Sequence, residues 1–263
     1  MSIVTGPRRP AVSVLPPMVK MKVAQEPLFK QAQANFKASP AGKIDNVLFR
    51  QRTGLSFERT QMADRSLDPY IGSFARDLAQ RFFKQGGSDP IIKLVIEFGC
   101  GLGRVAALLS KEKFIHYTGV ELAEPVVRAA KAAVNNRNFE LGDLLTYHTP
   151  RKFDAVIAAD VLSALSPNDQ LKALVNLDYL LATKGQLLLR WPAGENDVRI
   201  KTELTPEGPV QGWEFRATKS YIQRLLEVVG FFRNREIETV PVLTNAGTPE
   251  ERALPHHIVF AGK

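Results

Sequence analysis

The chain has 263 residues, 44% of them hydrophobic, which is enough to bury a core. It contains no apolar run of about 18 residues and no charged segment ahead of an apolar one, so we expect neither a membrane span nor a secretory signal. The single cysteine, Cys100, excludes an internal disulfide, and with only four histidines we expect no metal centre. The expected location is a reducing compartment, by default the cytoplasm.

The formal net charge of +8 is concentrated near the N-terminus, where residues 1–90 hold 14 Lys and Arg against 7 Asp and Glu. Residues 1–25 contain four prolines and no acidic residue, so we expect them to form an irregular basic arm. Organellar transit segments have a similar composition, and in that case the location is an organellar matrix. Basic arms can also bind nucleic acid or an acidic protein, although many serve only solubility.

Residues 26–90 are expected to form a helical extension. Its clearest helix begins after Pro69, where large apolar side chains recur every four residues at Tyr70, Phe74, Leu78 and Phe82. This stripe is expected to pack in a core, and the alternative is that it lines a ligand pocket.

The sequence changes character after residue 90. Short apolar runs alternate with helical patterns, and these runs span residues 94–98, 117–121, 153–159 and 186–191. That alternation predicts an α/β fold in which helices cover both faces of a mostly parallel sheet.

Some boundaries of the later elements are also readable. Helices are expected to begin at the capping residues Ser166 and Thr218, and the second is expected to end at Gly230. The strand-like segments 235–243 and 256–262 have no helix between them, so they are expected to pair antiparallel.

The strongest local feature is the sequence VIEFGCGLGR at residues 95–104. Glu97 is near the end of an apolar strand, and glycines follow at positions 99, 101 and 103. A glycine turn lets a ligand approach the backbone. The pattern differs from the dinucleotide motif G-x-G-x-x-G, because Arg104 occupies the position of the last glycine.

Acidic residues follow the next predicted strands. Glu121 lies 22 residues after Gly99 and can accept both hydroxyls of a ribose, and Asp143 and Asp160 follow the third and fourth strands. The carboxyl ends of parallel strands form one crevice, so these acids are expected to converge there. Taken singly, each acid is better explained as a helix cap, and only the ordered set favours ligand binding.

The ordered segments EFGCGLG, GVEL, LGDL, FDAVIAADVL and GQLLLRW resemble the class I S-adenosylmethionine-dependent methyltransferases. The resemblance covers about residues 91–263. It implies a Rossmann-like, doubly wound sheet of seven strands whose last strand is antiparallel.

The resemblance also implies a cofactor site for S-adenosylmethionine, whose product is S-adenosylhomocysteine. Glu97 would face the methionine ammonium, directly or through water, and Gly99 and Gly101 would let the cofactor lie close. Glu121 would hold the ribose hydroxyls and Leu122 would supply an apolar face. Asp143 would meet the adenine amino group beside Leu144. The full set is Glu97, Gly99, Cys100, Gly101, Glu121, Leu122, Asp143, Leu144 and Ala159.

Ala159 and Asp160 would border the methyl acceptor. Many small-molecule members of the family carry a histidine just after the fourth strand, where this chain has Ser163. Asp160 or Tyr70 is therefore the candidate catalytic residue. The histidine pair 256–257 is expected to be hydrogen-bonded in an edge strand rather than to act as a base.

The insertion 192–214 would cover the acceptor, and Trp191, Trp213 and Phe74 are the candidate substrate contacts. Nothing resembles the Asn/Asp-Pro-Pro-Tyr turn, because AADV stands in its place, and a lone cysteine disfavours cytosine methylation. The expected function is O- or N-methylation of a small molecule. The alternatives are an RNA or protein methyltransferase that uses the basic residues 1–90, or a non-catalytic, cofactor-binding assembly factor.

Overall fold

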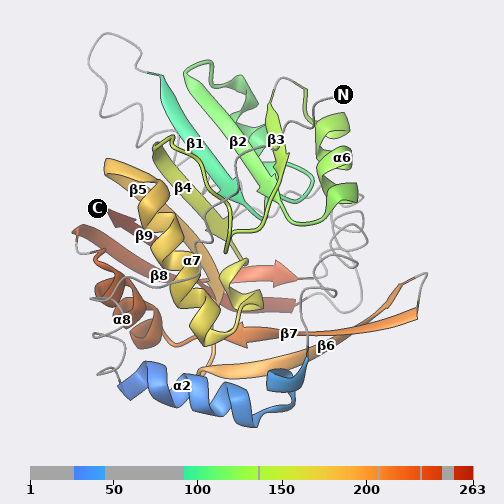
Figure 1. Ribbon diagram of the computed structural model, residues 1–263, viewed down its shortest axis with the longest axis vertical. Coiled ribbons are helices and arrows are strands. Elements are labelled where there is room, and N and C mark those ends of the chain that lie inside the picture. Colours follow the sequence, from blue (N-terminus) through green and yellow to red (C-terminus); the bar gives the residue numbers. More distant parts are fainter. Residues whose placement is uncertain are drawn as a thin grey trace, which may run out of the picture.

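A computed structural model of the protein describes residues 27–44, 92–135, 137–205, 208–231, 233–244 and 252–262 (Figure 1). The expected arm at residues 1–25, most of the expected extension, and with it Tyr70 and Phe74, lie outside the described residues.

The described part of the chain is built on a seven-stranded sheet with the order β3-β2-β1-β4-β5-β9-β8. The strands from β3 to β5 are parallel, and β9 is antiparallel to both of its neighbours. This arrangement confirms the predicted fold, including the antiparallel terminal pair. The strands are β1 (Lys93–Phe98), β2 (Ile115–Glu121), β3 (Asn138–Leu141), β4 (Phe153–Ala159), β5 (Leu181–Pro192), β8 (Arg233–Thr244) and β9 (Arg252–Gly262).

Consecutive residues of a strand point to opposite faces of the sheet, so apolar strands present an apolar surface on each face. Helices cover both of these surfaces. In β1, Ile96 and Phe98 pack into one cluster with α2, α7 and α8, whereas Val95 packs into a second cluster with α5 and α6. In Figure 1, α7 lies across β4 and β5. The helices are α2 (Pro27–Ala38), α5 (Arg104–Leu108), α6 (Glu124–Ala133), α7 (Pro167–Leu180) and α8 (Lys219–Val229).

The predicted helix boundaries at α7 and α8 are confirmed. The hydroxyls of Ser166 and Thr218 each accept a hydrogen bond from the backbone N–H three residues later, and Gly230 ends α8 in the left-handed conformation. Short 3-10 helices also occur: η1 (Pro40–Lys43), η2 (Leu109–Lys111) and η3 (Leu162–Ala164). None of the helices in the described ranges is long and apolar enough to cross a membrane.

The insertion after β5 forms a two-stranded hairpin of β6 (Asp197–Thr205) and β7 (Gly208–Arg216). Its register places Val198 opposite Phe215 and Ile200 opposite Trp213, so these apolar residues share one face. Helix α2 lies along the hairpin in Figure 1. The Phe36 ring of α2 meets the Trp213 ring edge to face, with centroids 4.8 Å apart. This contact joins the hairpin to the N-terminal helix.

The loop after β3 is tied to α7 by a buried amide. Asn176 Nδ2 donates to the carbonyl oxygens of Leu144 at 2.7 Å and Tyr147 at 3.1 Å. We expect Asn176→Ala to lower the free energy of unfolding by about 1–3 kcal/mol, because buried carbonyls lose their donor. Urea unfolding measures the change.

The matched control is Asn35→Ala in α2, whose side chain accepts from Gln31 on an exposed surface. We expect that substitution to cost less than about 0.5 kcal/mol. Equal stabilities of Asn176→Ala and the wild type would contradict the role of the amide.

Candidate functional site

The carboxyl ends of the central strands lie level with one another. Phe98 of β1 pairs with Val120 of β2 on one side and with Ala158 of β4 on the other. Glu121 pairs with Leu141 of β3. The loops that follow these strands therefore lie together at the edge of the sheet where open α/β folds have their ligand crevice, and this place is called the crevice below. Within the described ranges, no three His, Cys, Asp or Glu side chains are grouped so as to hold a metal ion.

The turn after β1 requires its glycines. Gly99, Gly101 and Gly103 have φ values of +66°, +52° and +81°, which side chains disfavour. A Cβ added at Gly103 would lie 2.9 Å from the Phe139 ring, and one added at Gly99 would lie 2.4 Å from Val161 Cγ2. Gly99 is exposed, whereas Cys100 and Gly101 are buried. The turn therefore packs tightly against Phe139 and Val161, and its backbone is accessible to a ligand at Gly99.

Glu97 is a buried acid at the end of β1, with 4% of its surface exposed. The hydroxyl of Tyr117 in β2 donates a hydrogen bond to Glu97 Oε2. Burial, and after it the negative charge of Glu97, raises the pKa of Tyr117 well above its ordinary value, so the phenol stays protonated. The pair keeps a carboxylate directly beside the glycine turn.

The Glu121 carboxylate bridges two loops. Its Oε2 accepts from Gly101 N at 3.2 Å, and its Oε1 accepts from Leu122 N at 2.7 Å and Ala123 N at 3.2 Å. The same side chain therefore orders the start of the β2–α6 turn and holds the glycine turn. Because Glu121 and Leu122 are only partly buried, a ligand can reach both.

The predicted third acid lies in the loop after β3. Asp143 Oδ1 accepts from Leu145 N at 2.9 Å, and the Asp143 carbonyl accepts from Tyr147 N at 2.7 Å. Asp143 is partly exposed and Leu144 is buried in the main core. The local hydrogen bonds hold the Asp143 carboxylate at the crevice edge.

Asp160 follows β4 in a strained conformation, with a φ of +60°. Its Oδ2 accepts from Arg190 Nε at 2.9 Å, and Arg190 Nη2 forms an ion pair with the same oxygen. Oδ1 is buried without a hydrogen-bond partner within the described ranges, although His256 Nε2 lies 3.9 Å away. Ala159, one residue earlier, is partly exposed.

The charge around Asp160 determines its protonation state. Burial alone would raise the pKa of Asp160, but the positive charge of Arg190, and after it the neighbouring His256, hold the pKa below its ordinary value. Arg104, the first residue of α5, acts in the same direction. Asp160 is therefore an ionised group at neutral pH and a weak proton acceptor.

Two of these partners were not singled out by the sequence pattern. Arg190 lies within the apolar run 186–191. His256 was expected only to be hydrogen-bonded in an edge strand, and that placement is wrong because β9 lies between β5 and β8. The antiparallel direction of β9 brings its early residues to the carboxyl end of β5, where His256 pairs with Pro192. His257 is hydrogen-bonded to Thr239 Oγ1 of β8 at 2.9 Å and to the carbonyl of Ala217, the residue after β7, at 3.2 Å.

The two tryptophans lie in the core between β5, β7 and the helices. Trp191 has no exposed surface and its Nε1 donates to the Phe215 carbonyl at 3.3 Å, and Trp213 is 5% exposed against Phe36. Their contact with a substrate stays a prediction.

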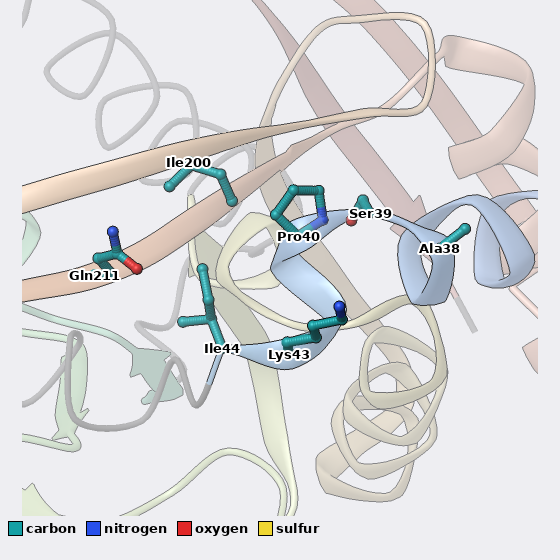
Figure 2. A pocket seen from close by; sticks show the side chains of 7 residues that line it. All are labelled: Ala38, Ser39, Pro40, Lys43, Ile44, Ile200 and Gln211. Carbon is teal, nitrogen blue, oxygen red and sulfur yellow. The ribbon is translucent and has the colours of Figure 1, made fainter.

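A hollow of about 450 Å³ opens between η1 and the hairpin β6–β7. Figure 2 shows Lys43 and Ile44 on one side of it and Ile200 and Gln211 on the other. No residue of the strand-end crevice lines this hollow, so it is separate from the candidate site.

The Asp160–Arg190 pair makes stability depend on pH. We expect Asp160→Asn to lower the free energy of unfolding at pH 7 by about 1–3 kcal/mol, since Arg190 is buried and loses its partner. This range is smaller than the cost of breaking a fully buried ion pair, because 34% of the Asp160 side chain is exposed and solvent weakens the interaction. Asparagine tolerates positive φ, so the substitution mainly removes charge. Thermal unfolding at several pH values measures the difference.

The sign follows from the lowered pKa of Asp160. The wild-type advantage is expected to be complete above about pH 5 and to disappear as the pH falls below about 4. An advantage that persists unchanged at pH 3.5 would contradict this account.

Comparisons with known proteins agree with this arrangement. Residues 96–187 match a family model described as a methyltransferase domain. This range includes the glycine turn and the strand-end acids Glu97, Glu121, Asp143 and Asp160. A search of curated proteins gives no match to the chain.

Several solved structures share the fold. An S-adenosylmethionine-dependent methyltransferase from Clostridium acetobutylicum has a TM-score of 0.53 at 12% identity, over 77% of this chain and 95% of that one. DesVI from Streptomyces venezuelae has a TM-score of 0.51 at 15% identity, over 77% and 96% of the two chains. The glycopeptide N-methyltransferase MtfA in complex with S-adenosylmethionine has a TM-score of 0.51 at 15% identity, over 72% and 86%. Residues 96–187 are therefore similar to a methyltransferase domain, and the seven-stranded sheet has the Rossmann-like fold of these solved structures.

Proposed function

We propose that the protein transfers a methyl group from S-adenosylmethionine to an oxygen or nitrogen of a small molecule. The observation that carries the proposal is the Glu121 carboxylate, which bridges the glycine turn and the β2–α6 turn at the strand ends. Support also comes from the fold neighbour MtfA, which has been crystallised with S-adenosylmethionine and with S-adenosylhomocysteine.

The donor groups of the cofactor match the acceptors in the crevice. Glu97 accepts an ammonium group at the methionine end, and the backbone at Gly99 allows close approach. Glu121 accepts the ribose hydroxyls, which then share or displace its backbone N–H donors, because a carboxylate has about four acceptor sites. Asp143 accepts the adenine amino group beside Leu144 and Leu122.

The cofactor supplies a methyl group on a positively charged sulfur. The chain's own residues then have to align the acceptor and exclude water, and alignment alone can contribute about 7–11 kcal/mol. Asp160 carries out this orientation at the acceptor end. Because Arg190 and His256 hold Asp160 ionised, its carboxylate is suited to accept a hydrogen bond from an amine or hydroxyl rather than to remove a proton.

The hairpin β6–β7 favours a small acceptor. It packs on η3, just after Asp160, and so covers that end of the sheet. MtfA is described as a glycopeptide N-methyltransferase, which supports transfer to a nitrogen. Most of the basic residues in 1–90 that favour an RNA or protein acceptor lie outside the described residues. The assembly-factor alternative predicts cofactor binding without turnover.

Binding of the cofactor tests the site. We expect Glu121→Ala to weaken S-adenosylhomocysteine binding by about tenfold to a hundredfold, because hydrogen bonds to a charged group contribute about 1.5–3 kcal/mol. Isothermal titration calorimetry measures both proteins. The matched control is Glu124→Ala, whose carboxylate makes an exposed ion pair with Arg128 in α6 and should leave affinity unchanged. Undiminished binding by Glu121→Ala would contradict the proposed cofactor site.

Turnover tests the acceptor class. S-adenosylhomocysteine formation is followed with panels of small amines, phenols and sugars, and with RNA and protein mixtures for comparison. We expect stimulation by a small molecule, reduced about tenfold or more in Asp160→Ala because orientation is lost. Stimulation by RNA or protein alone would reject the small-molecule proposal, and full turnover by Asp160→Ala would reject the role of that residue.

A further inference from the structure

Tyr117 is a buried phenol whose hydroxyl reaches a candidate cofactor ligand. It lies in β2 opposite Val95, and Glu97 lies two residues further along β1, opposite Gly119. Side chains on such a diagonal are within reach of each other when one is aromatic. The hydroxyl donates to Glu97 Oε2, and both residues are at most 4% exposed.

Packing fixes the direction of the Tyr117 ring. Its edge meets the Phe139 ring of β3, with the centroids 6.1 Å apart. Gly119 leaves the room that this packing needs, because an added Cβ there would lie 2.8 Å from both Cys100 Sγ and Phe139 Cδ1. The ring therefore has little freedom to turn its hydroxyl away from Glu97.

The hydrogen bond has an electrostatic consequence. An ionised carboxylate is costly to bury unless donors compensate for the lost water, and a donor to the charged form favours that form. Tyr117 is a dependable donor, since burial and then the charge of Glu97 raise its pKa far above neutrality. Removal of the hydroxyl takes this donor away from the buried Glu97 carboxylate.

We infer that Tyr117 is a positioning residue, which directs the Glu97 carboxylate to receive the ammonium group of the cofactor's amino-acid part. The inference rests on the proposed function and adds to it a residue that recognises the methionine end through Glu97. It predicts that recognition of the amino-acid part and recognition of the adenosine part can be separated by substitution.

Two ligands separate these contributions. S-adenosylhomocysteine contains the amino-acid part, whereas 5′-methylthioadenosine keeps the adenosine and the thioether without it. We expect Tyr117→Phe to weaken S-adenosylhomocysteine binding by about tenfold, as for loss of a charge-assisted hydrogen bond, and to change 5′-methylthioadenosine binding less than about twofold. Calorimetry with both ligands gives the two ratios.

The matched control is Tyr221→Phe, which also removes a buried phenol hydroxyl, here one that donates to Gln170 Oε1 at 2.8 Å between α8 and α7. It should leave both affinities unchanged. Glu97→Gln is the second variant and should show the same selective loss, with no further loss in the double variant. This variant keeps the inference testable if Tyr117→Phe fails to fold.

Equal weakening of both ligands by Tyr117→Phe would assign the residue a purely structural role and overturn the inference. Unchanged binding of S-adenosylhomocysteine by either Tyr117→Phe or Glu97→Gln would also overturn it. If the wild type binds neither ligand, the result contradicts the proposed function and also the inference that rests on it. If the wild type binds both and the selective loss is missing, only the inference fails.

Discussion

The hydrogen bonds of the Glu121 carboxylate connect the parts of the candidate site. One oxygen holds the turn that follows β1 through Gly101 N, and the other holds the turn that follows β2 through Leu122 N and Ala123 N. These turns come from neighbouring parallel strands, so a single side chain sets their spacing at the strand ends. The left-handed glycines can then keep the backbone open at Gly99 while their other side packs against Phe139 and Val161.

The acids on the two sides of this bridge have different partners. Glu97 accepts a hydrogen bond from a phenol, and Asp143 accepts one from a backbone N–H. Asp160 is instead paired with Arg190, with His256 nearby, so its charge is largely balanced. The first arrangement suits a ligand that carries an ammonium group and hydroxyls. The second suits the orientation of a neutral acceptor.

The sheet and the order of the acids could be predicted from the sequence, because apolar runs, glycines and strand-end acids are local patterns. The same holds for the caps of α7 and α8. The partners of Asp160 could not be predicted in this way. His256 lies 96 residues later in the chain, and only the antiparallel pairing of β9 with β5 brings it to the crevice. The Tyr117–Glu97 bond likewise depends on the register between β1 and β2, which neither strand alone reveals.

The central claim is that the strand ends around Glu121 hold the cofactor. A crystal structure of the protein with S-adenosylhomocysteine tests it most directly. The account predicts electron density between the glycine turn 99–103 and the turn after β2, with the ribose on Glu121, the ammonium on Glu97 and the adenine beside Asp143. Density at another place, such as the hollow beside η1, or an empty crevice at saturating ligand concentration, would contradict the claim.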